Sequence, residues 1–244
     1  MQLYQPQDGY CFNSDTHFLF NFITKGLSKF KNIQGELLDI GSGSGVLGLL
    51  LAREYSKINL NSCEIQNDFA FLSTKNAQVN NIDLKLHHNS FLENNFNYEF
   101  DMIVSNPPFY PSTVVQSTNE NIKIARYNDN LPLEKFIQKT SKLLKPSGKF
   151  FFCYDVKLLN DIIIFLKQNN LNVEAIQFLH PKKDKKASLV MVYARKNSKS
   201  LMDILPPLIM FEDTELSNEV QEIYKKCNTH SIKVQLQGDE LART

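Results

Sequence analysis

The chain has 244 residues, a formal net charge of +1, 42% hydrophobic residues and 22% charged residues. This length suffices for one sizeable globular domain, and the small net charge means that a nucleic-acid partner would need a local basic patch. The four cysteines form no C-x-x-C pair, which argues against a structural zinc site and a disulfide-rich scaffold. No stretch reaches the roughly 18 apolar residues that cross a bilayer, and the N-terminus lacks a signal-peptide pattern. We therefore expect a cytoplasmic monomer with no metal and no membrane contact.

Segments with a strand pattern alternate with segments with a helix pattern from about residue 15 to residue 195. The expected strands are 36–40, 58–64, 84–88, 100–105, 149–154, 173–179 and 188–194. The first expected helix begins at a cap formed by Ser14 and Asp15. The later helices begin near residue 46 and cover 67–79, 131–144 and 158–169. Such alternation predicts a parallel sheet with helices on both faces, and the last two strands form an antiparallel hairpin at one edge.

This pattern also suggests how the chain is divided. Residues 1–196 are expected to form one domain, with an N-terminal segment and helix at 1–34 and a substrate loop at 111–130. The pattern breaks up from residue 197, so residues 197–244 are expected to be an extension packed on the same domain. A short helix at 217–226 is the element expected within it.

A glycine-rich turn follows the first expected strand, in the sequence Leu37-Leu-Asp-Ile-Gly-Ser-Gly-Ser-Gly45. A turn between a strand and a helix is the setting that a nucleotide-binding glycine loop requires. Gly41 and Gly43, on either side of Ser42, let the backbone turn tightly and approach a ligand. The dinucleotide pattern G-x-G-x-x-G needs a glycine where this chain has Val46, so the loop differs from that of NAD-binding proteins.

Two carboxylates flank this loop. Asp39 stands beside it, where it can meet a cationic amino group. Glu64 ends the next strand, just before Ile65, where a carboxylate can accept hydrogen bonds from both hydroxyls of a ribose. Because the loop has no basic residue to balance a pyrophosphate, these residues fit S-adenosylmethionine (AdoMet), a ribose-bearing cation without phosphate. The alternative, a glycine turn that merely joins a strand to a helix, leaves the two carboxylates unexplained.

A second motif, Asp101-Met-Ile-Val-Ser-Asn-Pro-Pro-Phe109, places Asn106 at the carboxyl end of the fourth strand, where ligands bind in open α/β sheets. Pro107 and Pro108 end the strand and fix the direction of the Pro107 carbonyl. That carbonyl and the Asn106 side-chain oxygen can each accept one N–H of an amino group, while Phe109 stacks on its planar carrier. These contacts strengthen as positive charge develops on the nitrogen, so we predict methyl transfer to a planar amino or amide nitrogen. Taken alone, two prolines would indicate only a structural turn.

Weaker candidates surround these motifs. Ser14 either caps a helix or reaches the AdoMet carboxylate, and both interpretations stay open. Asn89, Ser90 and Phe91 follow the third strand, where AdoMet enzymes often bind the adenine ring. His87, His88 and Cys63 are interpreted as packing or surface residues rather than metal ligands.

Candidates for substrate contacts come from the hairpin connection and the long loop. Cations cluster near the hairpin at Lys182, Lys183, Lys185, Lys186, Arg195, Lys196 and Lys199. They form either a solvated turn or a patch that contacts RNA phosphates. Arg126 and Tyr127 lie in the loop 111–130, which is either a functional lid or a plain surface loop.

Together these features resemble a known family, the bacterial methyltransferases that modify N6 of an adenine beside the anticodon of a valine tRNA. The resemblance is carried by Gln5-Pro-x-x-Gly-Tyr10-x-Phe12-x-x-Asp15, 39–45, 106–109, Ile124-Ala-Arg126, His180-Pro181, Pro206-Pro207-Leu208 and 219–224. It implies a Rossmann-like class I methyltransferase fold with a seven-stranded, mostly parallel sheet. It also implies AdoMet as cofactor, tRNA as substrate, and an adenine flipped into a pocket walled by Phe109. Tyr127 replaces an expected histidine, and Ser90 an expected aspartate.

Other functions share parts of this pattern. A release-factor glutamine-N5 methyltransferase has a helical domain before its glycine loop, whereas fewer than 40 residues precede the loop here. A ribosomal-RNA guanine-N2 methyltransferase usually carries a duplicated second domain, and a DNA adenine methyltransferase a target-recognition domain; neither is apparent. An AdoMet-binding module without catalysis would not need Asn106, Pro107 and Phe109.

Overall fold

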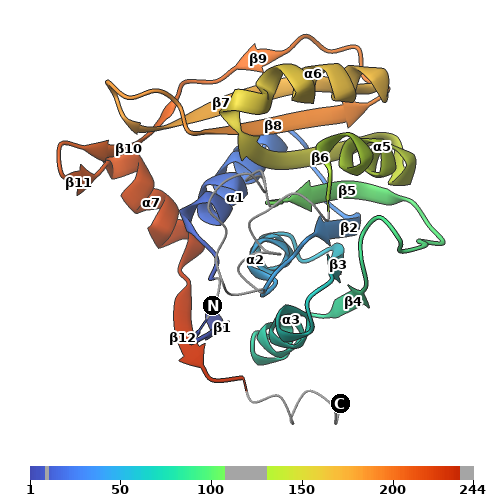
Figure 1. Cartoon of the computed structure of the whole chain (residues 1–244), viewed down its shortest axis with the longest axis vertical. Coiled ribbons are helices and arrows are strands. Elements are labelled where there is room, and N and C mark those ends of the chain that lie inside the picture. Colours follow the sequence, from blue (N-terminus) through green and yellow to red (C-terminus); the bar gives the residue numbers. More distant parts are fainter. Residues whose placement is uncertain (9–10, 108–130, 237–244) are drawn as a thin grey trace.

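The computed structural model describes residues 1–8, 11–107 and 131–236 of the chain. A large twisted sheet forms its centre, and helices cover both faces of that sheet (Figure 1). The strands are β1 (Gln2–Pro6), β2 (Gly35–Ile40), β3 (Ile58–Glu64), β4 (Leu84–His88), β5 (Phe100–Ser105), β6 (Leu144–Asp155), β7 (Leu171–Lys182), β8 (Leu189–Lys196), β9 (Asp203–Ile204), β10 (Leu208–Glu212), β11 (Glu215–Leu216) and β12 (His230–Val234). The helices are α1 (Ser14–Leu27), α2 (Val46–Glu54), α3 (Asn67–Val79), α5 (Leu133–Leu143), α6 (Leu159–Gln168) and α7 (Asn218–Cys227), with a short 3-10 turn at Val156–Leu158.

The order of strands across the main sheet is β11-β10-β7-β8-β6-β5-β2-β3-β4, and β9 pairs with β7. Strands β2 to β6 pair in parallel, while β8 runs antiparallel to both of its neighbours, β6 and β7. This is the predicted Rossmann-like methyltransferase sheet, with the predicted hairpin formed by β7 and β8. All seven predicted strands are present.

Side chains alternate between the two faces of the sheet, as the period of a strand requires. Along β6, Phe151 and Cys153 pack with α1 and α2, whereas Phe150, Phe152 and Tyr154 pack with α5 and α6. Both sets are almost fully buried. Two apolar cores thus sandwich the sheet and fix its register, because a slip of one residue would exchange the two faces.

The structure corrects several details of the prediction. The hairpin does not end the sheet, because β10 pairs in parallel with β7 and carries β11 beyond it. Residues 145–148, directly after the helix expected at 131–144, form an irregular stretch within β6, opposite a shift in register on β5. Such a bulge tolerates a proline and a positive φ, here 62° at Ser147. The N-cap of α1 is Asn13, whose side chain accepts from the Asp15 N–H, and not Ser14.

The two ends of the described chain meet. β1 pairs in parallel with β12 as a separate two-stranded sheet, which the sequence analysis did not predict. Helix α7, which directly precedes β12 in the chain, packs against α1 (Figure 1). Among the described residues, no helix is long and apolar enough to cross a membrane, and no group of three His, Cys, Asp or Glu side chains is arranged to hold a metal ion. The division into residues 1–196 and 197–244 and the monomeric state stay predictions.

Candidate active site

Three neighbouring strands bring the main sequence motifs to one edge of the sheet. Ile40 of β2 pairs with Cys63 of β3 on one side and with Ser105 of β5 on the other. The residues that follow these partners are the glycine loop, Glu64 and Asn106. They therefore meet at the carboxyl edge, where parallel α/β sheets bind ligands.

The glycine loop presents its backbone to open space. Gly41 and Gly43 have φ of 63° and 54°, which favour glycine over any residue with a side chain. A Cβ added at either position would meet no described atom within 4 Å. Between them, the buried Ser42 hydroxyl has no hydrogen-bond partner among the described residues. An unpaired polar atom beside an open loop fits a site that a polar ligand completes.

Asp39 lies beneath the loop and is 1% exposed. Its Oδ2 accepts a hydrogen bond of 2.9 Å from the backbone N–H of Gly48, in the first turn of α2. The pKa of Asp39 is raised to about 7, mainly by burial and to a smaller extent by the nearby Glu64 carboxylate, while the hydrogen bond from the Gly48 N–H lowers it. Asp39 thus positions α2 against the loop, a role that the sequence analysis missed. Its contact with a cationic amino group stays a prediction.

Glu64 organises the end of β3. Its Oε2 accepts from the Gly43 N–H at 2.8 Å, and its Oε1 accepts from the N–H groups of Ile65 and Gln66, both at 2.9 Å. Burial raises the pKa of Glu64, and these three N–H groups and His88 oppose that rise. Ile65 is 43% exposed and gives the site an apolar flank beside this carboxylate. Two buried carboxylates next to an open loop favour a cationic ligand, as AdoMet is.

Asn106 is held by two neighbours from different elements. Its Nδ2 donates to the Thr16 hydroxyl at 3.1 Å, and the Cys153 thiol donates to its Oδ1 at 3.0 Å. Burial raises the pKa of the Cys153 thiol well above its ordinary value, so the sulfur stays protonated and acts as a donor. Pro107 is buried directly after it. Pro108 and Phe109 lie outside the described residues, as do Arg126 and Tyr127.

The weaker candidates divide into those near the site and those engaged elsewhere. Ser14 lies in the first turn of α1, and its hydroxyl accepts from the Tyr224 hydroxyl of α7 at 2.8 Å. Asn89 is exposed, and its side chain accepts from the Ser90 N–H at 2.7 Å. Phe91 is 6% exposed and packs edge-on against Phe136, so its ring belongs to the core.

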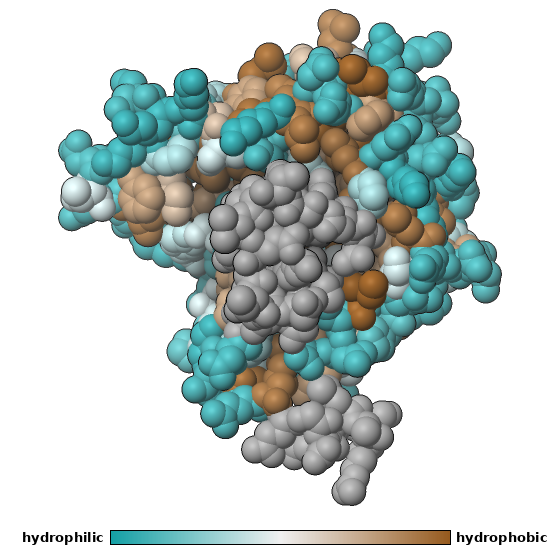
Figure 2. Space-filling view, viewed as in Figure 1, coloured by the Kyte–Doolittle hydropathy of each residue, from teal (hydrophilic) through white to brown (hydrophobic). Residues whose placement is uncertain are grey.

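The basic residues are split between the two ends of the strands. Lys182 and Lys183 lie at the carboxyl edge, where β7 ends. On the left of the molecule, where Figure 1 places β10 and β11, much of the outer surface is hydrophilic (Figure 2). Arg195, by contrast, lies where β8 ends beside the start of β7, and its Nε donates to the buried Glu174 at 2.8 Å. Phe211 of β10 pairs with Lys182, so the acidic residues of the β10–β11 turn lie next to this basic run. The seven cations therefore do not form one continuous patch.

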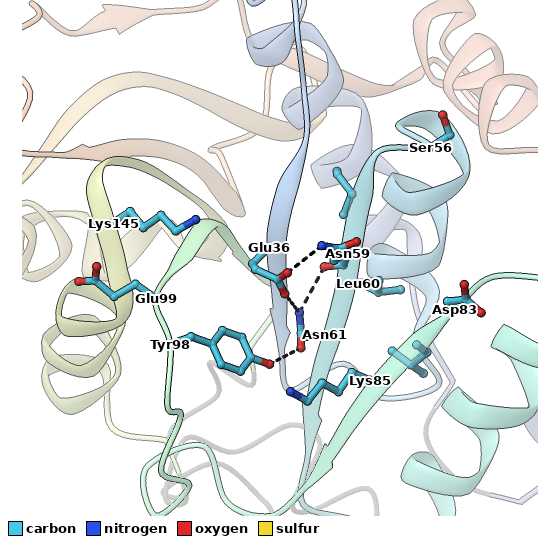
Figure 3. Close-up of a pocket in the computed structure, with 12 residues that line it drawn as sticks. Glu36, Ser56, Asn59, Leu60, Asn61, Asp83, Lys85, Tyr98, Glu99 and Lys145 are labelled. Atoms are coloured by element: carbon cyan, nitrogen blue, oxygen red, sulfur yellow. Dashed lines mark hydrogen bonds between the residues drawn. The ribbon is translucent and has the colours of Figure 1, made fainter.

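The structure also has an open groove of about 840 Å³ at the opposite, amino ends of β2, β3 and β4. Glu36 accepts hydrogen bonds from Asn59 and Asn61, and Tyr98 donates to Asn61 (Figure 3). These polar groups satisfy one another, and the sequence motifs lie at the other end of the strands. The groove is therefore not part of the candidate site.

Comparison with known proteins places the chain in a family. The family model described as methyltransferase small domain matches residues 16–177. The chain belongs to this family. The membership agrees with the predicted enzyme class, an AdoMet-dependent methyltransferase, and with the observed fold.

Individual relatives refine this picture. The chain is 27% identical over 157 residues to a tRNA1(Val) (adenine(37)-N6)-methyltransferase of Pedobacter heparinus, covering 64% of this chain and 67% of the relative. It is 30% identical over 141 residues to a protein of the same name from Porphyromonas gingivalis, covering 55% of each chain. With the latter, the match spans about half the length of the curated relative.

Solved structures show the same fold at low identity. A predicted O-methyltransferase from Agrobacterium tumefaciens superposes with a TM-score of 0.66 at 15% identity, over 90% of this chain and 99% of that chain. A 16S rRNA N2 methyltransferase from T. thermophilus, solved with AdoMet and guanosine, superposes with a TM-score of 0.55 at 21% identity. It covers 78% of this chain and 44% of that chain.

Proposed function

We propose that the protein transfers a methyl group from AdoMet to N6 of an adenine in tRNA, in the anticodon loop of a valine tRNA. The observation that carries this proposal is the meeting of Asn106 with Glu64 and the glycine loop at one sheet edge. An amide placed beside a cofactor loop suits an amino-group acceptor. The names of the relatives from P. heparinus and P. gingivalis support adenine in tRNA as the acceptor.

In this proposal the cofactor site is built by Asp39, the loop at 41–43 and Glu64. The Glu64 carboxylate would accept hydrogen bonds from the ribose hydroxyls through the lone pairs that its three backbone N–H donors leave free. Ile65 would pack on the adenine ring of the cofactor. Ser42 gains a partner when the site is filled. Ser14 and the segment 89–91 are further candidates for contacts with the cofactor. Ser14 already accepts a hydrogen bond from Tyr224, and the ring of Phe91 packs against Phe136. When bound, AdoMet supplies the methyl group.

The residues at the end of β5 handle the acceptor. Asn106 Oδ1 and the Pro107 carbonyl each accept one N–H of the adenine amino group, which turns its lone pair away from the ring and toward the cofactor. Transfer of the methyl group to the nitrogen would place positive charge on it, and the Asn106 Oδ1 and the Pro107 carbonyl would stabilise that charge. The nitrogen then loses a proton to solvent. Pro108 and Phe109 complete the pocket, with Phe109 stacked on the flipped base.

Contacts with the rest of the tRNA are assigned to Lys182 and Lys183 and to Arg126 and Tyr127, which lie outside the described residues. The two lysines lie at the same edge as Asn106, where phosphates near a flipped adenine would pass. A monomer in the cytoplasm, with its C-terminal extension packed on the catalytic domain, completes the proposal.

One parallel assay tests this function. The protein is incubated with methyl-labelled AdoMet and, separately, with bulk tRNA, ribosomal RNA, DNA and a peptide-chain release factor. We expect label in tRNA alone, recovered as N6-methyladenosine after digestion to nucleosides. Label in release factor alone would assign glutamine-N5 methylation, and label in ribosomal RNA as N2-methylguanosine would assign the guanine-N2 reaction; either result would overturn the proposal.

A further inference from the structure

We propose that Gln5 is a positioning residue for the glycine loop, through which the paired ends of the chain, β1 and β12, set the affinity for AdoMet. The proposal rests on the glycine loop being the AdoMet site. It does not depend on which molecule accepts the methyl group.

Gln5 connects β1 to the loop directly. Although polar, it is only 1% exposed. Its Nε2 donates to the hydroxyl of Ser44 at 2.6 Å, and its Oε1 accepts from the N–H of Phe12 at 3.4 Å. Ser44 stands between Gly43, whose N–H donates to Glu64, and Gly45, the N-cap residue of α2. A buried amide with partners on both of its ends has one stable orientation, so it fixes Ser44 relative to β1.

Asn76 of α3 makes a second connection between the same two segments. Its Nδ2 donates to the carbonyl of Ser44 at 2.9 Å and to the carbonyl of Tyr4 at 3.1 Å. Its Oδ1 accepts from the N–H of Tyr4 at 2.6 Å. The side chain is fully buried. The hydroxyl of Ser44 thus accepts from Gln5 of β1, and its carbonyl accepts from Asn76. Because Asn76 also bonds to Tyr4 of β1, both hydrogen bonds tie Ser44 to that strand.

β1 in turn depends on the C-terminal strand. A two-stranded sheet is marginal by itself, and β1 has β12 as its strand partner, in register from Gln2 with His230 to Pro6 with Val234. Asn80 of α3 closes the outer end, accepting from the Gln2 N–H and donating to the Gln2 carbonyl. The connection therefore runs from β12 through β1 and Gln5 to the glycine loop.

This connection matters because the loop faces open space at two glycines. A loop of that kind samples many conformations, and binding must select the one that matches the cofactor. Bonds to Ser44 hold the loop in that conformation before the ligand arrives and so reduce the ordering cost of binding. Loss of the Gln5 bond should lower the fraction of molecules whose loop is ready to bind.

The test compares Gln5→Leu with Gln2→Leu, a matched control on the exposed face of the same strand, in the full chain. AdoMet affinity is measured by titration calorimetry, and amide hydrogen exchange is followed at 41–48 and in β3 and β5. We expect the AdoMet Kd to rise about fivefold to twentyfold in Gln5→Leu and less than twofold in Gln2→Leu. Exchange should be faster at 41–48 and unchanged in the strands.

An unchanged Kd, or a weaker Kd with faster exchange in β3 and β5 as well, would overturn the proposal. If Gln5→Leu fails to fold, Ser44→Ala removes only the hydroxyl that accepts from Gln5, and the same changes in Kd and exchange are expected. Asn76→Asp tests independently the connection between α3 and Ser44. Where both fold, the Gln5→Leu and Ser44→Ala effects on Kd should not add. AdoMet binding by a wild-type protein that does not methylate tRNA would refute the substrate and leave this test intact.

Discussion

Asn106 donates a hydrogen bond from Nδ2 to the hydroxyl of Thr16, 3.1 Å away, and so joins the end of β5 to the first turn of α1. A side-chain amide can turn over and exchange its oxygen with its nitrogen. Because the nitrogen is engaged by Thr16, the oxygen is the atom beside Cys153 and is available as an acceptor. The proposed reaction needs this orientation, since only the oxygen can accept an N–H of the substrate.

Thr16→Val should therefore weaken catalysis without weakening cofactor binding. Valine keeps the shape of threonine but cannot accept the bond from Asn106, so the amide is free to adopt the inactive orientation. We expect kcat to fall about threefold to tenfold, as for the loss of one hydrogen bond of about 1 kcal/mol, with an AdoMet Kd within twofold of wild type. Steady-state methylation kinetics check this, with Thr74→Val on α3 as control. Equal effects of the two substitutions on kcat would show that Thr16 has no such role.

Glu64→Gln should act on the cofactor instead. Three backbone N–H groups converge on the carboxylate, and glutamine would turn an NH2 group toward at least one of them. The substitution also removes the acceptor capacity proposed for the ribose. We expect the AdoMet Kd to rise at least tenfold and the melting temperature to fall. Calorimetric titration and thermal unfolding measure both, and a Kd within twofold of wild type would remove Glu64 from the cofactor site.

Asp39 should make stability depend on pH. Its pKa is about 7 in the folded protein, above the ordinary value of 3.8, so the folded state holds a proton that the unfolded state releases between these values. The contribution of Asp39 to the free energy of unfolding therefore falls as the pH rises from about 4 to 7. Asp39→Asn removes the cost of burying an ionised carboxylate. The variant should be more stable than wild type by about 2–4 kcal/mol at pH 8 and about as stable as wild type at pH 4.

Chemical denaturation of wild type and Asp39→Asn at both pH values tests this sign. A difference in the free energy of unfolding that is the same at pH 4 and pH 8 would contradict the raised pKa. The same variant should bind AdoMet more weakly at pH 8, where Asp39 is ionised and the substitution removes an anion beside the loop, and the difference in affinity should shrink as the pH falls below 7. A variant with higher stability and lower affinity would separate the two roles of this residue.

The lysines of the β7–β8 connection should affect tRNA and not the cofactor. Lys183→Glu combined with Lys186→Glu reverses two exposed charges at the carboxyl edge. We expect the KM for tRNA to rise about tenfold and its salt dependence to become shallower, with an unchanged AdoMet Kd. Lys199→Glu, an exposed cation beyond the end of β8, is the matched control. If the control raises KM as much as the double variant, the carboxyl edge is not the tRNA surface.

Strong periodic signals explain why the fold could be predicted. Apolar runs such as 150–154 and 189–194 leave few alternatives to buried strands, and turn residues such as those of the glycine loop mark where a strand ends. The pair β1–β12 could not be predicted, because its segments lie more than 220 residues apart and neither has a clear apolar alternation. Only the likeness of the Gln5-Pro segment to the family's N-terminal motif indicated that this region matters.

Site residues could be predicted where a local sequence motif fixes their position. The side chains that contact them could not be predicted where tertiary packing brings distant segments together. Spacing from a strand end predicted the positions of Glu64 and Asn106. The partners Thr16 and Cys153 come from segments 90 and 47 residues away from Asn106, and the sequence around them carries no signal of their role. Ser14 was misread as a cap because Asn13, one residue earlier, has the same capping chemistry.

The most direct test of the proposed function is the nucleoside content of tRNA after reaction with AdoMet and either the wild-type protein or Asn106→Ala. We expect N6-methyladenosine with wild type, a rate at least a hundredfold lower with Asn106→Ala, and an AdoMet Kd of the variant within threefold of wild type. Mass spectrometry of the digested tRNA and calorimetric titration give these three values. Near-normal methylation by Asn106→Ala would contradict the role proposed for Asn106, and a methylated product other than N6-methyladenosine would contradict the proposed function.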